Sequence, residues 1–209
     1  PCPRCRRVDR GPLAPNLHLR PLVWQAAGMP GITTDREGAI ATLFIDNPAR
    51  RNAMTADMYS AVPAAVDHLL TDLDIRALIV RGAGDEAFGA GSDISEFPTR
   101  RMGDQAAAYD SAEHDAWDAL AAVPIPVIAA IHGPCMGGGI AMALHCDVRI
   151  AADDAKFSVP PARLGLAYPQ DALGRLVDLV GSAQAKLLLY TARVIDAEEA
   201  LRIGLVQEV

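Results

Sequence analysis

Three consecutive glycines, Gly137, Gly138 and Gly139, follow a strand-like run at 127–131 and open an apolar, helix-like segment. Glycine lets a substrate atom approach the main chain without meeting a Cβ, and the start of a helix leaves backbone N–H groups unpaired. Such N–H groups suit an oxygen that gains negative charge during a reaction. Taken alone, the glycines are explained equally well by a tight turn that packs a helix against a strand.

A second turn of small residues, FGAGSDI at 88–94, follows another strand-like run at 77–81. It too leads into a segment that could be helical. Two strand-to-helix turns of this kind can converge on one oxygen, so the pair indicates an anion-stabilising site made of main-chain groups.

The elements that must position these turns follow from the hydrophobic pattern. Residues 32–45 alternate around a turn at 35–38, which predicts a β-hairpin. Thr55 is expected to cap a helix whose apolar residues recur through 58–69, and further helices are predicted at 104–122 and 139–146. Strands are predicted at 77–81, 127–131 and 148–151. Alternating strands and helices indicate an α/β fold.

Composition limits the class of protein. The chain has 209 residues, of which 51% are hydrophobic, enough for one substantial core. Residues 31–209 are therefore expected to form one domain, preceded by a flexible or irregular Pro- and Arg-rich lead at 1–30. The net charge of −7 argues against a nucleic-acid partner, although local arginines can still hold an anionic ligand.

The four cysteines predict neither a disulfide framework nor a metal site. Cys2 and Cys5 form a CxxC pair, but no second pair or histidine cluster follows at ligand spacing. No run has the length and apolarity of a membrane helix or a secretory signal, so no membrane partner and a cytoplasmic location are expected.

The two glycine-rich turns carry a family resemblance. The sequence resembles the crotonase (enoyl-CoA hydratase/isomerase) superfamily, whose signatures are FxAGxD[IL] and, about 45 residues later, AxxGxxxGGG. The resemblance covers 31–209 and includes NPARRNA at 47–53 and ALRIGLV at 200–206. It implies a crotonase-like ββα spiral that lacks the C-terminal helical region found in family members, and a homotrimer or hexamer.

The resemblance also implies a site. The N–H groups of Ser92 and Gly138 would form an oxyanion hole for the carbonyl of an acyl-CoA substrate, with no tightly bound cofactor. Coenzyme A would lie along 50–53 and 90–94, with Arg51 near a phosphate and the Ala90 carbonyl near the adenine. A solvated surface role explains Arg51 as well, and a helix cap explains Asp93. The expected coenzyme A-binding residues are Arg51, Ala53, Ala90, Gly91, Asp93 and Ile94.

The sequence departs from the hydratases of the family at two positions. Their first glutamate follows the glycine run in GGGxE, where this chain has Ala141, and their second follows FxxP, where it has Pro161. Neither side chain can carry a proton, and positioned acid and base groups are what activate water. Plain hydratase activity is therefore expected to be very low.

Few residues could replace these glutamates. Tyr168 lies in LGLAY, which is similar to the LGxxY of a decarboxylase branch, although that branch has a histidine where this chain has Ser92. A tyrosine before a proline is also common in a core. Tyr109, Asp110 and His114 could supply a proton, or could belong to an amphipathic helix face.

The sequence thus predicts an acyl-CoA-processing enzyme that stabilises a thioester enolate or oxyanion, with Ser92, Gly138 and Tyr168 as its catalytic residues. The alternatives are an acyl-CoA decarboxylase or hydrolase that uses Tyr168, and an acyl-CoA binder without turnover. The acyl group is left open by the sequence.

Overall fold

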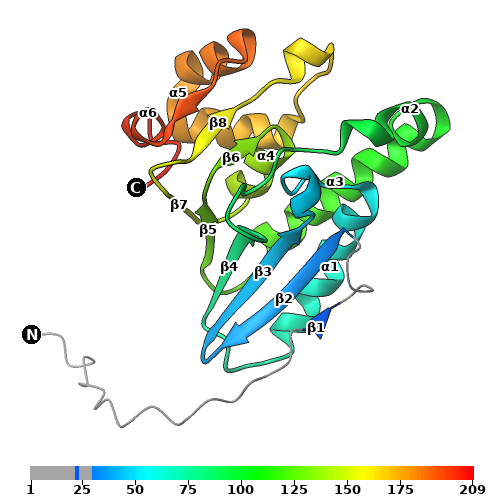
Figure 1. Cartoon of the computed structure of the whole chain (residues 1–209), viewed down its shortest axis with the longest axis vertical. Coiled ribbons are helices and arrows are strands. Elements are labelled where there is room, and N and C mark those ends of the chain that lie inside the picture. The colour runs from blue at the N-terminus through cyan, green and yellow to red at the C-terminus, as the bar shows by residue number, and fades with distance from the viewer. Residues whose placement is uncertain (1–21, 24–29) are drawn as a thin grey trace, which may run out of the picture.

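A six-stranded sheet forms the base of the molecule (Figure 1). A computed structural model of the chain describes residues 22–23 and 30–209. The strand order is β1-β2-β3-β4-β5-β7. Strands β3, β4, β5 and β7 run parallel to one another, whereas β2 is antiparallel to both of its neighbours, β1 and β3. The bounds are β1 Leu22–Val23, β2 Gly31–Glu37, β3 Ile40–Asp46, β4 Ala77–Gly82, β5 Val127–Ile131 and β7 Val148–Ala151.

A smaller sheet stands beside the first and contains β6 (Pro134–Met136), β8 (Lys156–Ser158) and β9 (Ile195–Asp196) in the order β6-β8-β9. β6 and β8 are parallel, and β9 runs antiparallel to β8. Since β6 begins three residues after β5 ends, the chain passes directly from the large sheet into the small one.

Six helices complete the described part of the chain. In Figure 1, α1 and α3 lie beside the large sheet, while α4, α5 and α6 accompany the small sheet. Short 3-10 turns occupy 48–50, 94–96, 103–105 and 161–164. The helices are α1 Ala56–Leu70, α2 Phe97–Arg100, α3 Ala106–Ala121, α4 Gly138–Leu144, α5 Gln170–Thr191 and α6 Ala197–Arg202.

Helix α1 forms as its sequence predicts. The Thr55 side chain caps it by accepting a hydrogen bond from Met58 N at 3.2 Å. Tyr59, Val62 and Val66 then recur at helical spacing and are buried in the core. This helix therefore places Tyr59 in the interior, close to the two glycine-rich turns.

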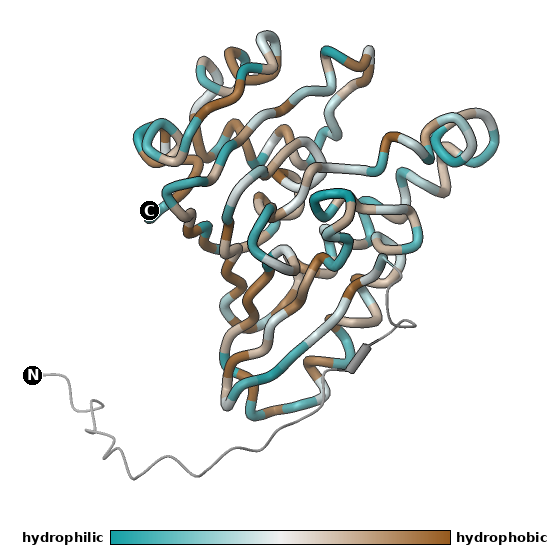
Figure 2. Tube along the Cα trace, in the orientation of Figure 1, coloured by the Kyte–Doolittle hydropathy of each residue, from teal (hydrophilic) through white to brown (hydrophobic). Residues whose placement is uncertain are grey.

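The α/β architecture expected from the sequence is confirmed. The hairpin, the three later strands and the helices at α1, α3 and α4 all form close to their predicted bounds. The predicted turn at 35–38 is wrong by about two residues, because Asp35, Arg36 and Glu37 remain paired with β3 and the chain reverses at Gly38 and Ala39. Those polar side chains fit at the exposed end of the hairpin, which is hydrophilic in Figure 2.

One hydrophobic core extends from β2 to the segment after α6. The lead proposed for 1–30 lies outside the described residues, apart from the two of β1 and Pro30. Among the described residues, no helix has the length and apolar character needed to span a bilayer. Within the same residues, no group of three or more His, Cys, Asp or Glu side chains is arranged to hold a metal ion.

A substitution at Leu43, in the middle of β3, tests how much the hydrophobic core contributes to stability. Its side chain is 0% exposed, whereas that of Leu73 is 84% exposed. We expect Leu43→Ala to lower the free energy of unfolding by about 2–5 kcal/mol, because burial is lost and a cavity remains. Leu73→Ala should change it by less than about 0.5 kcal/mol. Urea unfolding of both variants gives the comparison, and equal values would contradict this description of the core.

Candidate active site

The two glycine-rich turns are joined by main-chain hydrogen bonds. Gly89 N donates to Pro134 O at 3.0 Å and Met136 N donates to Gly89 O at 2.9 Å, so that Gly89 faces Cys135 in a parallel bridge. Three residues further along both segments are Ser92 and Gly138. A Cβ built on Gly138 would stand 3.2 Å from Ser92 N, which shows how closely the two approach.

The direction of the Ser92 amide follows from a second bridge, between Met54 and Ser92. Met54 N donates to Gly91 O at 2.8 Å and Asp93 N donates to Met54 O at 2.7 Å. Successive amides of an extended segment point to opposite sides, so the N–H of Ser92 points away from Met54. No acceptor among the described residues takes it.

The peptide between Gly137 and Gly138 is fixed from both sides. Gly137 has φ +48° and ψ −108°, a conformation open to glycine, and its N–H donates to Ser158 O at 3.0 Å. Its carbonyl accepts a hydrogen bond from the Tyr168 hydroxyl at 3.2 Å. The next N–H, that of Gly138, is the first of α4 and has no acceptor within the described chain.

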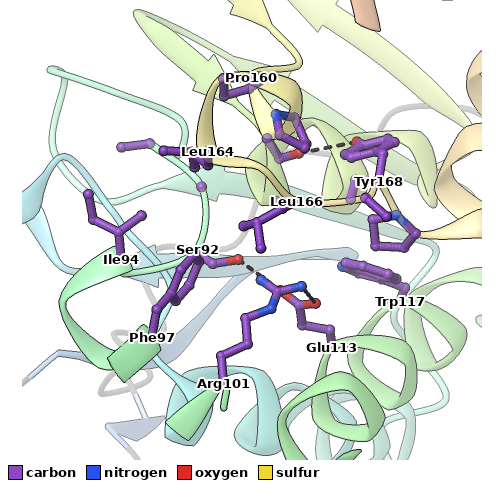
Figure 3. Close-up of a pocket in the computed structure, with 18 residues that line it drawn as sticks. Ser92, Ile94, Phe97, Arg101, Glu113, Trp117, Pro160, Leu164, Leu166 and Tyr168 are labelled. Carbon is purple, nitrogen blue, oxygen red and sulfur yellow. Dashed lines mark hydrogen bonds and ion pairs between the residues drawn. The ribbon is translucent and has the colours of Figure 1, made fainter. Parts of the chain in front are cut away.

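Both turns border a pocket (Figure 3). The polar side chains in its wall belong to Ser92, Arg101, Glu113 and Tyr168. The remainder of the wall is made of apolar side chains and glycines, which suits an apolar part of a ligand. The apolar side chains are those of Ala90, Ile94, Phe97, Trp117, Ala141, Pro160, Pro161, Leu164, Leu166, Ala167 and Pro169.

Glu113 of α3 is the buried carboxylate of this pocket, with 2% of the residue exposed. It accepts a hydrogen bond from Ser92 Oγ at 2.8 Å. Arg101 approaches both of its oxygens, with Nη2 3.0 Å from Oε2 and Nη1 3.4 Å from Oε1. The hydroxyl of Tyr59 lies 3.0 Å from Ser92 Oγ, so the Ser92 hydroxyl contacts both Tyr59 and Glu113.

Burial sets the protonation of these groups. It raises the pKa of Glu113 above its usual value, against the opposing effects of the Arg101 guanidinium and the Ser92 hydrogen bond. Burial also raises the pKa of Tyr59 and of Tyr168, so that both phenols keep their protons at neutral pH. Glu113 is therefore the group in this network whose charge state can change.

Of the expected site residues, Ser92, Gly138, Tyr168, Ala90, Gly91 and Ile94 all line the pocket. Arg51, Ala53 and Asp93 do not. Arg51 is exposed beside a separate depression, and the Ala53 carbonyl is buried against Asn47 Nδ2 at 2.8 Å. Asp93 caps the 3-10 turn by accepting from Ser95 N at 3.0 Å, as the alternative interpretation of this residue held.

Glu113, Arg101 and Tyr59 were missed by reasoning from the sequence. That reasoning proposed Tyr109, Asp110 and His114 as proton donors, but none of the three lines the pocket. A usable signal does exist, because Glu113 falls in the buried stripe of α3, four residues from both Tyr109 and Trp117. A glutamate inside an apolar stripe indicates a carboxylate that faces the interior.

Residues 35–209 match the family model described as enoyl-CoA hydratase/isomerase, and the chain belongs to this family. It is 39% identical over 178 residues to a protein named crotonyl-CoA hydratase from Syntrophomonas wolfei, covering 85% of this chain and 68% of that one. A probable enoyl-CoA hydratase from Mycobacterium avium is 40% identical over 173 residues, with coverage of 83% and 66%.

The fold is that of the same family. The crystal structure of an enoyl-CoA hydratase/carnithine racemase from Magnetospirillum magneticum superimposes with a TM-score of 0.83 at 40% identity, covering 87% of this chain and 68% of that one. The expected crotonase superfamily and crotonase-like fold are thus confirmed. The chain spans about two thirds of the length of these relatives.

The raised pKa of Glu113 predicts how stability depends on pH. The folded chain holds this proton more tightly than the unfolded chain, in which a glutamate titrates near about 4.3. The contribution of Glu113 to the free energy of unfolding is therefore greatest at low pH and falls as the pH rises through the folded pKa, by at most about 1.4 kcal/mol per pH unit.

Urea unfolding of wild type and Glu113→Gln between pH 4 and pH 8 measures this effect. We expect wild type to lose stability relative to the variant as the pH rises. Glu198→Gln, at an exposed carboxylate of α6, controls for the loss of one negative charge. A wild type that gains stability relative to Glu113→Gln with rising pH would show that the ion pair with Arg101 outweighs burial.

Proposed function

We propose that the chain is an acyl-CoA-processing enzyme in which the N–H groups of Ser92 and Gly138 form an oxyanion hole for the thioester carbonyl. The observation that carries the proposal is the approach of these two amides, which find no acceptor among the residues that the structure describes, at the edge of an apolar pocket. Membership of the enoyl-CoA hydratase/isomerase family supports the class of substrate.

Two such donors act on charge that develops during the reaction. A thioester oxygen becomes negative when the α-carbon loses a proton, when a carboxylate on that carbon leaves as carbon dioxide, or when the carbonyl is attacked by a nucleophile. Removing one donor of this kind typically costs about 3 kcal/mol of transition-state stabilisation. The apolar wall strengthens both hydrogen bonds, because less water screens them.

Tyr168 acts in this proposal through the main chain. Its hydroxyl donates to the carbonyl of Gly137, which belongs to the same peptide group as the N–H of Gly138. A hydrogen bond at one end of a peptide polarises and orients the other end. Tyr168 is thus a positioning residue, rather than a contact of the reacting carboxylate as in the decarboxylase alternative.

We further propose that plain hydration is not the main reaction. Ala141 and Pro161 both line the pocket, and neither side chain can act as an acid or a base. Placement of coenzyme A along 50–53 and 90–94, with Arg51 near a phosphate, and assembly into a homotrimer or hexamer stay proposals that rest on the resemblance. Decarboxylation, thioester hydrolysis and binding without turnover are the alternatives that a product screen separates.

Gly138→Ala tests the oxyanion hole. The new methyl group would collide with the Tyr59 hydroxyl and stand 3.2 Å from Ser92 N, which forces the two amides apart. We expect kcat/KM to fall by about 10²–10³, the effect of losing one donor. Products from crotonyl-, malonyl-, methylmalonyl- and butyryl-CoA are followed by mass spectrometry.

Gly174→Ala is the matched control, since a Cβ there meets nothing within 4 Å inside α5. It should leave kcat/KM unchanged. Equal activity in the two variants would contradict the proposed oxyanion hole, and acyl-CoA binding by wild type without any product would favour the non-catalytic alternative.

Tyr168→Phe tests the positioning role. The change removes the hydroxyl that donates to the Gly137 carbonyl and leaves the second donor to that oxygen, Ala141 N at 3.0 Å, in place. We expect kcat to fall about tenfold, the effect of about 1.4 kcal/mol, with KM little changed. Tyr190→Phe, at a side chain that is 76% exposed, serves as control. Initial rates over a range of substrate concentration give both constants, and a rise in KM at constant kcat would point to ground-state contact instead.

A further inference from the structure

Among the described residues that line the pocket, Glu113 is the only carboxylate. Its place in the wall and its hydrogen bond to the residue that carries one of the two amides suggest more than a structural role. We propose that Glu113 is the base and acid of this pocket, which takes the α-proton of a bound acyl thioester and returns it. This inference rests on the proposed oxyanion hole.

The position of Glu113 relative to the substrate follows from Ser92. The main-chain N–H of Ser92 is a proposed donor to the thioester oxygen, and its side-chain Oγ donates to Glu113 Oε1 at 2.8 Å. The α-carbon of a thioester is bonded to the carbonyl carbon. A substrate held by Ser92 and Gly138 therefore brings its α-carbon into the pocket whose wall contains Glu113 (Figure 3).

The carboxylate is also held in one orientation. Arg101 approaches both of its oxygens, and the guanidinium itself lies 5.0 Å from the ring centres of Phe97 and Tyr109. A base that is fixed before the reaction needs little reorganisation during it. Figure 3 shows the Ser92 side chain pointing toward the adjacent Arg101–Glu113 pair.

The proton transfer balances without a further reactant. A carboxylate oxygen of Glu113 forms an O–H bond with the α-hydrogen, and the electron pair of the broken C–H bond becomes the C=C bond of the enolate. The carbonyl π pair moves to the oxygen, where the two N–H groups stabilise it. In reverse, Glu113 returns a proton to the α-carbon, and exchange with solvent in between labels that carbon in D₂O.

A structural ion pair between Glu113 and Arg101 makes different predictions. Such a pair would affect stability alone, whereas a base makes α-proton exchange rise with pH as its carboxyl ionises. The charged, titratable and hydrogen-bonding groups that surround the carboxyl come from its own helix and from four other segments. They are Tyr109, Asp110 and His114 of α3, Arg101 after α2, Ser92, Tyr59 of α1 and Tyr168 before α5.

The experiment measures deuterium incorporation at the α-carbon of butyryl-CoA in D₂O by mass spectrometry. Wild type should exchange, and Glu113→Gln should lose at least about 10² of the rate, because an amide keeps the shape but takes no proton. Glu113→Asp, which keeps a carboxylate, should retain measurable exchange and guards against misfolding of the glutamine variant. Binding of butyryl-CoA, by calorimetry, should change less than about threefold in Glu113→Gln.

Glu96→Gln is the matched control. Glu96 accepts a hydrogen bond from Ala56 N at 2.8 Å and does not line the pocket. The Glu96→Gln variant should therefore exchange the α-hydrogen of butyryl-CoA at the wild-type rate. Exchange by Glu113→Gln at the wild-type rate would overturn the assignment, and so would a wild type that binds butyryl-CoA without exchange. Failure of the proposed oxyanion hole gives a different result from failure of the Glu113 assignment. Without the oxyanion hole, wild type would not bind butyryl-CoA, or Gly138→Ala would exchange the α-hydrogen at the wild-type rate.

Discussion

The parallel bridge between Gly89 and Cys135 is the contact on which the site depends. Two main-chain hydrogen bonds set its register, and that register places Ser92 opposite Gly138. A slip of one residue would turn one of the two amides away, since neighbouring peptides of an extended segment point in opposite directions. The glycines, the small sheet and the hydroxyl of Tyr168 all keep this arrangement in place.

Much of the fold was predictable from the sequence because its signals are local. Thr55 predicts the start of α1. The alternating pattern of β3 and the apolar run of β5 predict strands that are buried in a sheet. The resemblance, which rests on two motifs at a fixed spacing, implied the pairing of Ser92 with Gly138. Glu113 was not identified, because its place in the pocket depends on how α3 packs against the first glycine-rich turn. The two segments are 21 residues apart in the sequence, and the sequence pattern does not reveal that they are in contact.

The same packing explains how the pocket keeps a carboxylate although Ala141 and Pro161 carry none. A buried charge is costly unless it is paired, and Glu113 is paired with Arg101 and hydrogen-bonded to Ser92. Burial nevertheless raises its pKa. Arg101 and Ser92 favour the charged form of this carboxyl while burial favours the protonated form, and both forms are needed by a group that takes and returns a proton.

We propose above all that the amides of Ser92 and Gly138 bind one thioester oxygen. The most direct measurement is a ¹H–¹⁵N correlation spectrum of the ¹⁵N-labelled chain titrated with butyryl-CoA, with coenzyme A alone as reference. We expect both amide protons to move downfield together, with the same binding constant, and coenzyme A alone to leave them in place. Amide signals of Ser92 and Gly138 that stay in place while butyryl-CoA binds would contradict it.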